Sequence, residues 1–216
     1  MPCEALDDDN IVPMILPRLY AIADASCFSD TAASCAFAEE LLAGGVTLLQ
    51  YRNKTGNARQ TLDQARELRR RIGTRATLIM NDRADLALAA GFDGVHVGQD
   101  DFSPEGARKV IGPKLWLGLS THNPEQIAVG DRTSADYLAV GPVFPTSSKV
   151  KPDPVIGLEG VRKARALTRK PLVAIGGITR ANCRSVIEAG ADSVAVIADL
   201  LRDSRKSAEE FLRVLR

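Results

Sequence analysis

Two aspartates stand at positions suited to a metal site in the stretch 79–101 of this 216-residue chain. Asp82 follows the apolar run 78–80, and Asp101 follows the apolar run 94–97, nineteen positions after Asp82. A short helix between the runs would make the two strands parallel neighbours about 4.8 Å apart, with both carboxylates at one edge of the sheet. Two such carboxylates repel each other unless a cation lies between them, and Mg²⁺ commonly uses one or two carboxylates plus a substrate phosphate. The pair predicts metal-assisted phosphate chemistry.

Helix capping is an alternative role for Asp82 or Asn81, because Asp and Asn often cap the helix that follows a strand. This alternative does not extend to Asp101. Ser103, followed by a proline, already supplies the cap of the next helix. The sequence leaves both roles of Asp82 open.

Ser120 follows the fifth predicted strand. It is not needed as a helix cap, because Asn123 before a proline is predicted to cap the next helix, so Ser120 is available for a functional role. The chain has two histidines. His96 falls within a strand, and we interpret it as a hydrogen-bonded structural residue. His122 lies near the expected site, and its role stays open.

The elements that carry these residues recur along the chain as apolar strand, polar residues, amphipathic helix and glycine. Eight strands are predicted, at 19–23, 47–51, 77–80, 94–97, 115–119, 137–140, 172–175 and 193–197. Eight parallel strands alternating with helices over roughly 200–250 residues are typical of a (β/α)8 barrel, whereas an open doubly wound sheet usually has fewer. We therefore predict an α/β fold with a single (β/α)8 TIM barrel over 18–216. Residues 1–17 are predicted to form an N-terminal extension that is partly disordered or helical.

Composition limits the partners of the chain. Lysine and arginine number 28 against 27 aspartates and glutamates, so the net charge is +1 and no nucleic-acid footprint is expected. The four cysteines show neither CxxC spacing nor an extracellular disulfide pattern, which suits a reducing cytosol. The apolar runs are strand-sized, too short for a membrane span. We expect a cytoplasmic protein without a nucleic-acid or membrane partner, and the sequence leaves open whether it forms a homodimer.

In a barrel, polar residues at the carboxyl ends of the strands converge on one mouth. After the second strand, alternation directs Gln50, Arg52 and Lys54 to one side and Tyr51 and Asn53 to the other. An Arg and a Lys directed into the mouth suit a diphosphate group. The alternative is a solvated loop whose charges form ion pairs.

The connection after the sixth strand, 141–157, is the only long one, and long loops in compact domains are usually functional or mobile. It contains hydroxyl side chains beside a lysine, which are good phosphate ligands, although polar turns look similar. These candidate residues are Thr146, Ser147, Ser148 and Lys149.

The seventh strand ends at Gly176 and Gly177, before a helix predicted to begin near Arg180. Glycines before a helix N-terminus let backbone N–H groups approach an anion, aided by the helix dipole. The eighth strand ends at Ile197 and Ala198, and the loops after the last two strands are the common phosphate site of such barrels. The mouth is therefore predicted to have two anion subsites, one with Mg²⁺ and one without.

Six stretches of the chain together resemble the thiamine phosphate synthase (thiamine-phosphate pyrophosphorylase) family. They lie within about 18–201, in order and with fitting spacing. They are QYRNK at 50–54, ND at 81–82, GVHVGQDD at 94–101, GLSTH at 118–122, DYLAVGPVFPTSSK at 136–149 and AIGGI at 174–178. Such a set is far more specific than any one motif.

The resemblance implies coupling of hydroxymethylpyrimidine diphosphate to methylthiazole ethyl phosphate, which yields thiamine phosphate and diphosphate. It implies Mg²⁺ on Asp82 and Asp101. The residues implied to hold the pyrimidine diphosphate are Gln50, Arg52, Lys54, Asn81, Ser120 and Lys149, of which Arg52, Ser120 and Lys149 are the expected catalytic residues. The residues implied to hold the thiazole phosphate are Thr146, Ser148, Gly176 or Gly177, and the backbone at Ile197 and Ala198. Ser147 is a further expected substrate-binding residue.

Two residues depart from the family pattern. Asn53 stands where the family usually has an acidic residue, and Ala198 stands where it usually has serine. Asn53 points away from the site by alternation, and if only the backbone N–H binds phosphate, Ala198 preserves the contact. Two rival functions remain: a thiazole tautomerase of the same fold, which would not need the Asp pair, Arg52 and Lys149 together, and a sensor that binds thiamine phosphate without turnover.

Overall fold

The computed structural model describes residues 15–146 and 153–216, and the predicted barrel is confirmed. Eight parallel strands pair in chain order, and β8 pairs with β1 to close the sheet. The strands are β1 Leu19–Asp24, β2 Leu48–Arg52, β3 Thr77–Asn81, β4 Gly94–Val97, β5 Trp116–Thr121, β6 Tyr137–Val140, β7 Leu172–Ile175 and β8 Ser193–Val196. Each observed strand lies within one or two residues of its predicted bounds.

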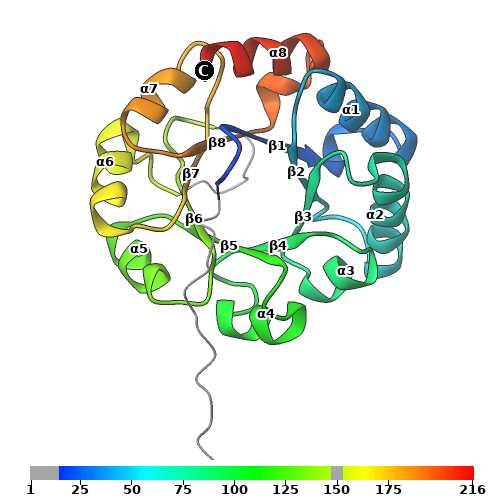
Figure 1. Ribbon diagram of the computed structural model, residues 1–216, viewed down its shortest axis with the longest axis horizontal. Helices are drawn as coiled ribbons and strands as arrows, with labels where there is room; N and C mark the ends of the chain where they lie inside the picture. The colour runs from blue at the N-terminus through cyan, green and yellow to red at the C-terminus, as the bar shows by residue number, and fades with distance from the viewer. Residues whose placement is uncertain (1–14, 147–152) are drawn as a thin grey trace, which may run out of the picture.

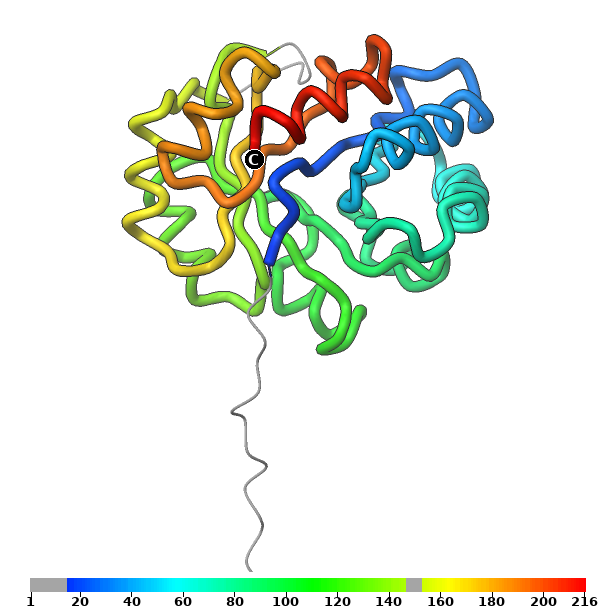
Figure 2. The backbone as a smooth tube through the Cα atoms, turned by 45° about the horizontal axis from the view of Figure 1, so that its top comes forward, coloured from blue at the N-terminus to red at the C-terminus, as the bar shows by residue number. Residues whose placement is uncertain are grey.

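Helices surround the ring of strands (Figure 1). The helices are α1 Thr31–Ala43, α2 Ala58–Ile72, α3 Ala84–Ala89, α4 Pro104–Ile111, α5 Pro124–Asp131, α6 Gly157–Leu167, α7 Cys183–Glu188 and α8 Ser204–Val214, with short 3-10 turns η1 Ala25–Cys27 and η2 Ala198–Leu200. Figure 2 shows the last helix, α8, beside α1, so the outer ring of helices closes as the sheet does.

Most of the predicted N-terminal extension, 1–14, lies outside the described residues, and its structure stays a prediction. Within its described part, Leu16 is buried and belongs to the cluster of side chains inside the barrel.

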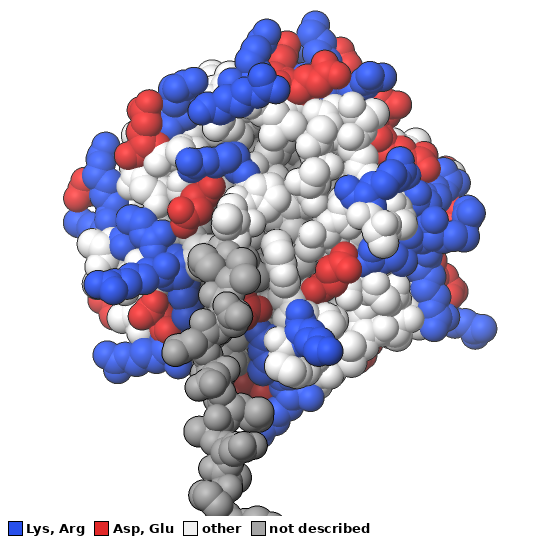
Figure 3. Space-filling model, in the orientation of Figure 1, with Lys and Arg blue, Asp and Glu red and all other residues white. Residues whose placement is uncertain are grey.

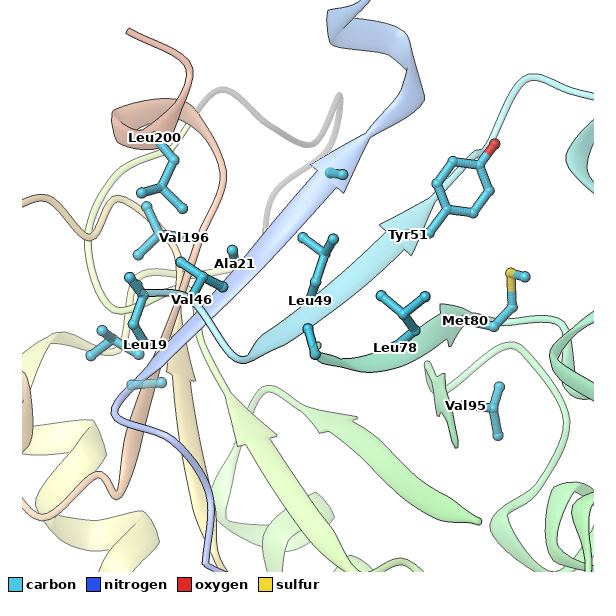
Figure 4. Close-up of a cluster of buried hydrophobic side chains, with 14 of the residues drawn as sticks. Leu19, Ala21, Val46, Leu49, Tyr51, Leu78, Met80, Val95, Val196 and Leu200 are labelled. Carbon is cyan, nitrogen blue, oxygen red and sulfur yellow. The ribbon is translucent and has the colours of Figure 1, made fainter. Parts of the chain in front are cut away.

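Strand alternation divides the buried side chains into two cores. Outward-facing residues such as Leu49, Leu78 and Val95 pack between the sheet and the helices (Figure 4). Inward-facing residues such as Leu48, Ile79 and Val173 fill the barrel interior. The carboxyl ends of all eight strands consequently open on one face, which is the face on which barrel active sites lie.

An Arg–Asp pair recurs at the opposite, amino-terminal end of the sheet. In each case an aspartate just before an even-numbered strand accepts the backbone N–H of the preceding strand and an arginine from an even-numbered helix. The pairs are Arg69–Asp93 at 2.6 Å, Arg108–Asp136 at 2.7 Å and Arg165–Asp192 at 2.9 Å. At three places around the barrel, these contacts therefore connect one helix with two neighbouring strands.

Charged side chains lie around the rim of the face drawn in Figure 3, and its centre is largely uncharged. Basic side chains gather over α2, on the right of the view. Several of them are ion-paired, since Arg70 and Arg71 both contact Glu67. Among the described residues, no helix combines the length and hydropathy that crossing a membrane requires.

Candidate active site

A cavity of about 650 Å³ opens at the carboxyl ends of the strands. All the sequence-predicted site residues that the structure describes line it. They are Gln50, Arg52, Lys54, Asn81, Asp82, Asp101, Ser120, Thr146, Gly176, Gly177, Ile197 and Ala198. Ser147, Ser148 and Lys149 lie outside the described residues. The structure thus gathers residues from seven strands and their loops around one volume, and the roles of these residues remain predictions.

The two aspartates meet although only one of them follows its strand directly. Asp82 comes after β3 with φ 63°, and its N–H donates to the carbonyl of His96 at 2.8 Å. Asp101 lies four residues beyond β4, and a turn brings it back, because its Oδ2 accepts the N–H of Gly98 at 2.8 Å. The turn thus brings the Asp101 carboxyl close enough to the Asp82 carboxyl to raise the pKa of Asp82.

Helix capping does not explain Asp82. The residue at the N-cap of α3 is Arg83, and no side chain caps that helix. By contrast, Ser103 and Asn123 cap α4 and α5 as expected. The alternative role considered for Asp82 and Asn81 is therefore wrong.

The electrostatics of the pair favour a cation. Burial raises the pKa of Asp82, the Lys54 ammonium lowers it, and the Asp101 carboxyl raises it again. Lys54 is ion-paired with Asp82. Two hard oxygen donors, one partly desolvated, match the ligands that Mg²⁺ prefers. The described residues contain no cluster of three metal-ligating side chains, so water and substrate phosphate would complete the coordination, as is usual for Mg²⁺.

Strand β2 divides its side chains as the alternation predicted. Gln50, Arg52 and Lys54 line the cavity, whereas Tyr51 and Asn53 both contact Gln64 of α2 outside the sheet. Arg52 is held by an ion pair with the buried Asp24, which ends β1. Its guanidinium is therefore fixed at the mouth and still carries donors that face the cavity.

Asn81 has an unsatisfied donor. Its Nδ2 is buried and has no hydrogen-bond partner within the described residues. Because a buried donor without a partner costs about 1–3 kcal/mol, a ligand acceptor in the cavity would relieve it.

The loops after β7 and β8 form a second, metal-free corner. Gly176 and Gly177 adopt φ of 101° and 62°, which other residues rarely adopt. A Cβ on Gly177 would lie 2.5 Å from the carbonyl oxygen of Pro145, so the loop after β6 itself requires this glycine. Arg180 joins the two loops, with its N–H and guanidinium on Asp199 at 2.8–3.1 Å.

The predicted helix start near Arg180 is wrong. Helix α7 begins at Cys183 and has six residues, because Thr179 and Asn182 form a turn first, with the Thr179 N–H on Asn182 Oδ1 at 2.7 Å. The dipole of α7 therefore gives no support to an anion site at Gly177. The backbone cradle of the two glycines is what remains.

His96 and His122 differ in environment. His96 is buried, accepts or donates at both ring nitrogens, and is hydrogen-bonded as expected. Burial lowers its pKa to about 4, so its ring is neutral at pH 7. His122 places Nδ1 2.8 Å from the carbonyl oxygen of Gly141 and 3.5 Å from the carboxylate of Asp153, at the edge of the cavity.

Comparison with known proteins decides the family. The family described as thiamine monophosphate synthase matches residues 19–200. The chain belongs to this family. A thiamine-phosphate synthase of Koribacter versatilis is 66% identical over 203 residues, which are 93% of this chain and 96% of the relative. One of Chloroflexus aurantiacus is 45% identical over 202 residues, 92% of either chain. The family resemblance of the six stretches is confirmed, and the chain is an enzyme, a transferase.

Solved structures agree with this family assignment. The thiamine phosphate pyrophosphorylase from Pyrococcus furiosus is 35% identical, with a TM-score of 0.81, covering 92% of this chain and 95% of its own. A 3-hexulose-6-phosphate synthase at 18% identity and TM-score 0.69 shares the fold alone. The candidate site of this thiamine monophosphate synthase family member lies on the face of the barrel on which active sites are usually found.

Three residues of the site were missed by the sequence analysis. Asp24 anchors Arg52, and Tyr20 and Tyr137 lie inside the barrel in contact with Gln50 and His96. A polar residue at the end of the first strand was a usable signal for Asp24. The tyrosines carry no such signal, because tyrosine is common in strands and its inward direction depends on the register.

Proposed function

We propose that the chain couples hydroxymethylpyrimidine diphosphate to methylthiazole ethyl phosphate, giving thiamine phosphate and diphosphate, with Mg²⁺ held by Asp82 and Asp101. Family membership supports the overall reaction. One observation carries the assignment of the site. The carboxylate pair with its neighbouring cations and the double-glycine corner open into the same cavity. One cavity with two separate anion subsites suits two phosphorylated substrates that must react with each other.

The side chains of β2 are placed to receive the diphosphate. Arg52 is fixed by Asp24, and Lys54 lies beside Asp82, so both cations stand next to the proposed metal ligands. When bound there, Mg²⁺ would add positive charge that stabilises the departing diphosphate. The Asn81 amide offers its unsatisfied N–H to the same ligand. Lys149, outside the described residues, is proposed to supply a further cation.

The reaction needs few further catalytic groups from the protein. The bond between the pyrimidine methylene carbon and the diphosphate oxygen breaks first, and its electron pair leaves with the diphosphate. The thiazole nitrogen then gives its lone pair to the methylene carbon. No general base is required, so the main task of Arg52 and Lys54 is to stabilise the departing negative charge. The corner at Gly176 and Gly177 holds the second phosphate and orients the thiazole.

The reducing cytoplasm is the proposed location of the activity. Among the described residues, Cys27, Cys35 and Cys183 are free, which suits a compartment that keeps thiols reduced.

The proposal is tested by mixing both substrates with the purified protein and Mg²⁺ and separating the products by chromatography. We expect thiamine phosphate and diphosphate in equal amounts, and loss of turnover with EDTA. Asp82→Asn and Asp101→Asn should each lower kcat/KM by at least about 100-fold, or roughly 2.7 kcal/mol. Asp85→Asn is the matched control and should stay near wild type, because Asp85 of α3 is in an exposed ion pair with the N-cap residue Arg83.

Other outcomes identify the rivals. Conversion of the thiazole phosphate alone, without release of diphosphate, would make the chain a tautomerase. Tight binding of thiamine phosphate without turnover would make it a sensor. Near wild-type activity of both aspartate variants at limiting Mg²⁺ would refute the metal assignment.

A further inference from the structure

Five side chains form a continuous line of hydrogen bonds through the barrel interior. Gln50 Nε2 donates to the Tyr20 hydroxyl at 2.9 Å, and the Tyr20 and Tyr137 hydroxyls are 3.0 Å apart. The Tyr137 hydroxyl lies 3.0 Å from His96 Nδ1, and His96 Nε2 lies 2.8 Å from Ser120 Oγ. The line thus joins two residues of the proposed substrate site, Gln50 and Ser120, through three residues that have no part in the proposed chemistry.

The direction of every hydrogen bond follows from the first. The amide nitrogen of Gln50 can only donate, so the Tyr20 hydroxyl accepts from it. The hydrogen of this buried hydroxyl goes to Tyr137, its one other partner among the described residues. Tyr137 then gives its hydrogen to His96 Nδ1, which must be unprotonated. His96 is left with its proton on Nε2 and donates it to Ser120 Oγ. The opposite direction for every bond would require the Gln50 amide to turn, so that its oxygen accepts from the Tyr20 hydroxyl.

We propose that Tyr20, Tyr137 and His96 are positioning residues that set the hydrogen-bonding polarity of the site. They hold Gln50 with its carbonyl oxygen toward the cavity, and they leave the Ser120 hydroxyl hydrogen to the cavity. Gln50 therefore accepts from a bound ligand, and Ser120 donates to one. This inference rests on the proposed function only in taking Gln50 and Ser120 as substrate contacts.

The surrounding structure is built to accommodate the line. A Cβ on Gly118 of β5 would lie 2.2 Å from the Tyr137 ring and 2.3 Å from His96 Nδ1, so only glycine leaves room for their contact. Tyr20 and Tyr137 are 1% and 0% exposed. Apolar side chains could fill these positions without the need to satisfy buried polar groups, and a fully connected polar line is instead expected to fix one arrangement.

The tautomer of His96 gives a test that is independent of activity. The chain has two histidines, and His122 supplies an internal contrast, because its Nδ1 faces a carbonyl oxygen and must carry a proton. Protein labelled with ¹⁵N-histidine should show at pH 7 one ring protonated at Nε2 only, assigned to His96 by its loss in His96→Gln. A His96 ring protonated at Nδ1 would overturn the proposal.

Kinetics test the consequence for substrate binding. Tyr20→Phe and Tyr137→Phe each remove one oxygen from the line, and each should raise the KM for the pyrimidine diphosphate by about three- to tenfold. The KM for the thiazole phosphate should stay within about twofold, since a polarity change acts on one substrate. Tyr51→Phe is the matched control, because Tyr51 is a buried tyrosine of β2 whose hydroxyl contacts Gln64 outside the barrel.

Several results would refute the role. An equal rise in KM for both substrates would refute it. So would a rise in Tyr51→Phe equal to that in the two variants, or an unchanged KM in every variant. If the wild-type protein forms no thiamine phosphate, the proposed function fails, and the histidine tautomer in wild type and in Tyr137→Phe decides the polarity alone. The Nε2–H form should lose its dominance in Tyr137→Phe, because Nδ1 then has no donor.

Discussion

Single residues of this site depend on neighbours that are distant in sequence. Arg52 reaches its position because Asp24 of another strand holds it, and Asp101 reaches Asp82 because the Gly98 N–H turns its carboxylate back. His96 is kept neutral by burial, at a pKa of about 4. The chemistry of each residue is thus set by its environment more than by its type.

The buried histidine predicts a loss of stability in acid. The pKa of His96 lies below its usual 6.5 in the folded state, so only the unfolded state takes up the proton between about pH 6.5 and pH 4. In EDTA, the free energy of unfolding should fall over this range by up to about 3 kcal/mol. The raised pKa of Asp82 acts in the opposite direction. Urea unfolding at both pH values measures the loss, which should shrink in His96→Gln.

Ala198 and Gly177 test how the second phosphate is held. Ala198 is exposed to the cavity, and a backbone contact to phosphate does not need a hydroxyl, so Ala198→Ser should change the thiazole-phosphate KM by less than about tenfold, or 1.4 kcal/mol. Gly177→Val should lower both affinity and melting temperature, because a Cβ collides with the loop at Pro145. A large gain from Ala198→Ser would show that a missing hydroxyl matters more than the backbone.

At the scale of elements, the same strand serves both cores. Strand β2 sends Gln50 and Arg52 into the barrel and Tyr51 toward α2 because successive side chains alternate. The loop after β6 continues beside β7, with the Val143 N–H on the Ile175 carbonyl at 2.9 Å and the Phe144 N–H on the Gly176 carbonyl at 3.0 Å. This pairing holds the base of the loop against the glycine corner.

The Arg–Asp pairs at the amino-terminal ends of the strands are expected to contribute to the stability of the barrel and not to catalysis. Asp136→Ala removes the acceptor of both Arg108 and the Leu117 N–H, so unfolding should become easier by about 1–2 kcal/mol while kcat is unchanged. The control is Glu209→Ala, whose exposed pair with Arg205 on α8 is worth less than about 0.5 kcal/mol. Denaturant unfolding compares the two variants. A fall in kcat for Asp136→Ala would contradict this separation of roles.

At the scale of the whole molecule, the two ends of the barrel are specialised. The amino-terminal end carries the repeated ion pairs, and the carboxyl end carries the cavity, which is lined by Asp82 at an unfavourable positive φ and by the glycines Gly176 and Gly177. Closure of the ring through β8 and β1 gives both ends one rigid frame. Ligands bound at the mouth should therefore stabilise the entire barrel.

Mg²⁺ with inorganic diphosphate should raise the melting temperature of the protein. At a ligand concentration a hundredfold above Kd, binding adds about 2.7 kcal/mol, which for a chain of this length corresponds to roughly 5–10 °C. The double variant Asp82→Asn, Asp101→Asn should lose most of the shift, because the diphosphate would then lack the metal. Differential scanning calorimetry measures both. An equal shift in the double variant would mean that the diphosphate binds without the aspartates.

The sequence by itself determined the barrel and most of the candidate site. Apolar runs of strand length, alternating with capped helices, are local patterns, and the carboxyl ends of parallel strands share one face whatever the side chains are. This is why Gln50, Arg52, Asp82 and Ser120 could be named without coordinates. The family motifs then fixed the reaction class.

Only the tertiary structure decided what lies between these residues. The partnership of Asp24 with Arg52, the return of Asp101 to Asp82 and the line through Tyr20 and Tyr137 all depend on register and turns across the closed sheet. The true start of α7 depends on a turn that competes with the helix pattern. Such contacts join residues up to 117 positions apart, and no local pattern specifies them, because packing chooses among many locally equivalent arrangements.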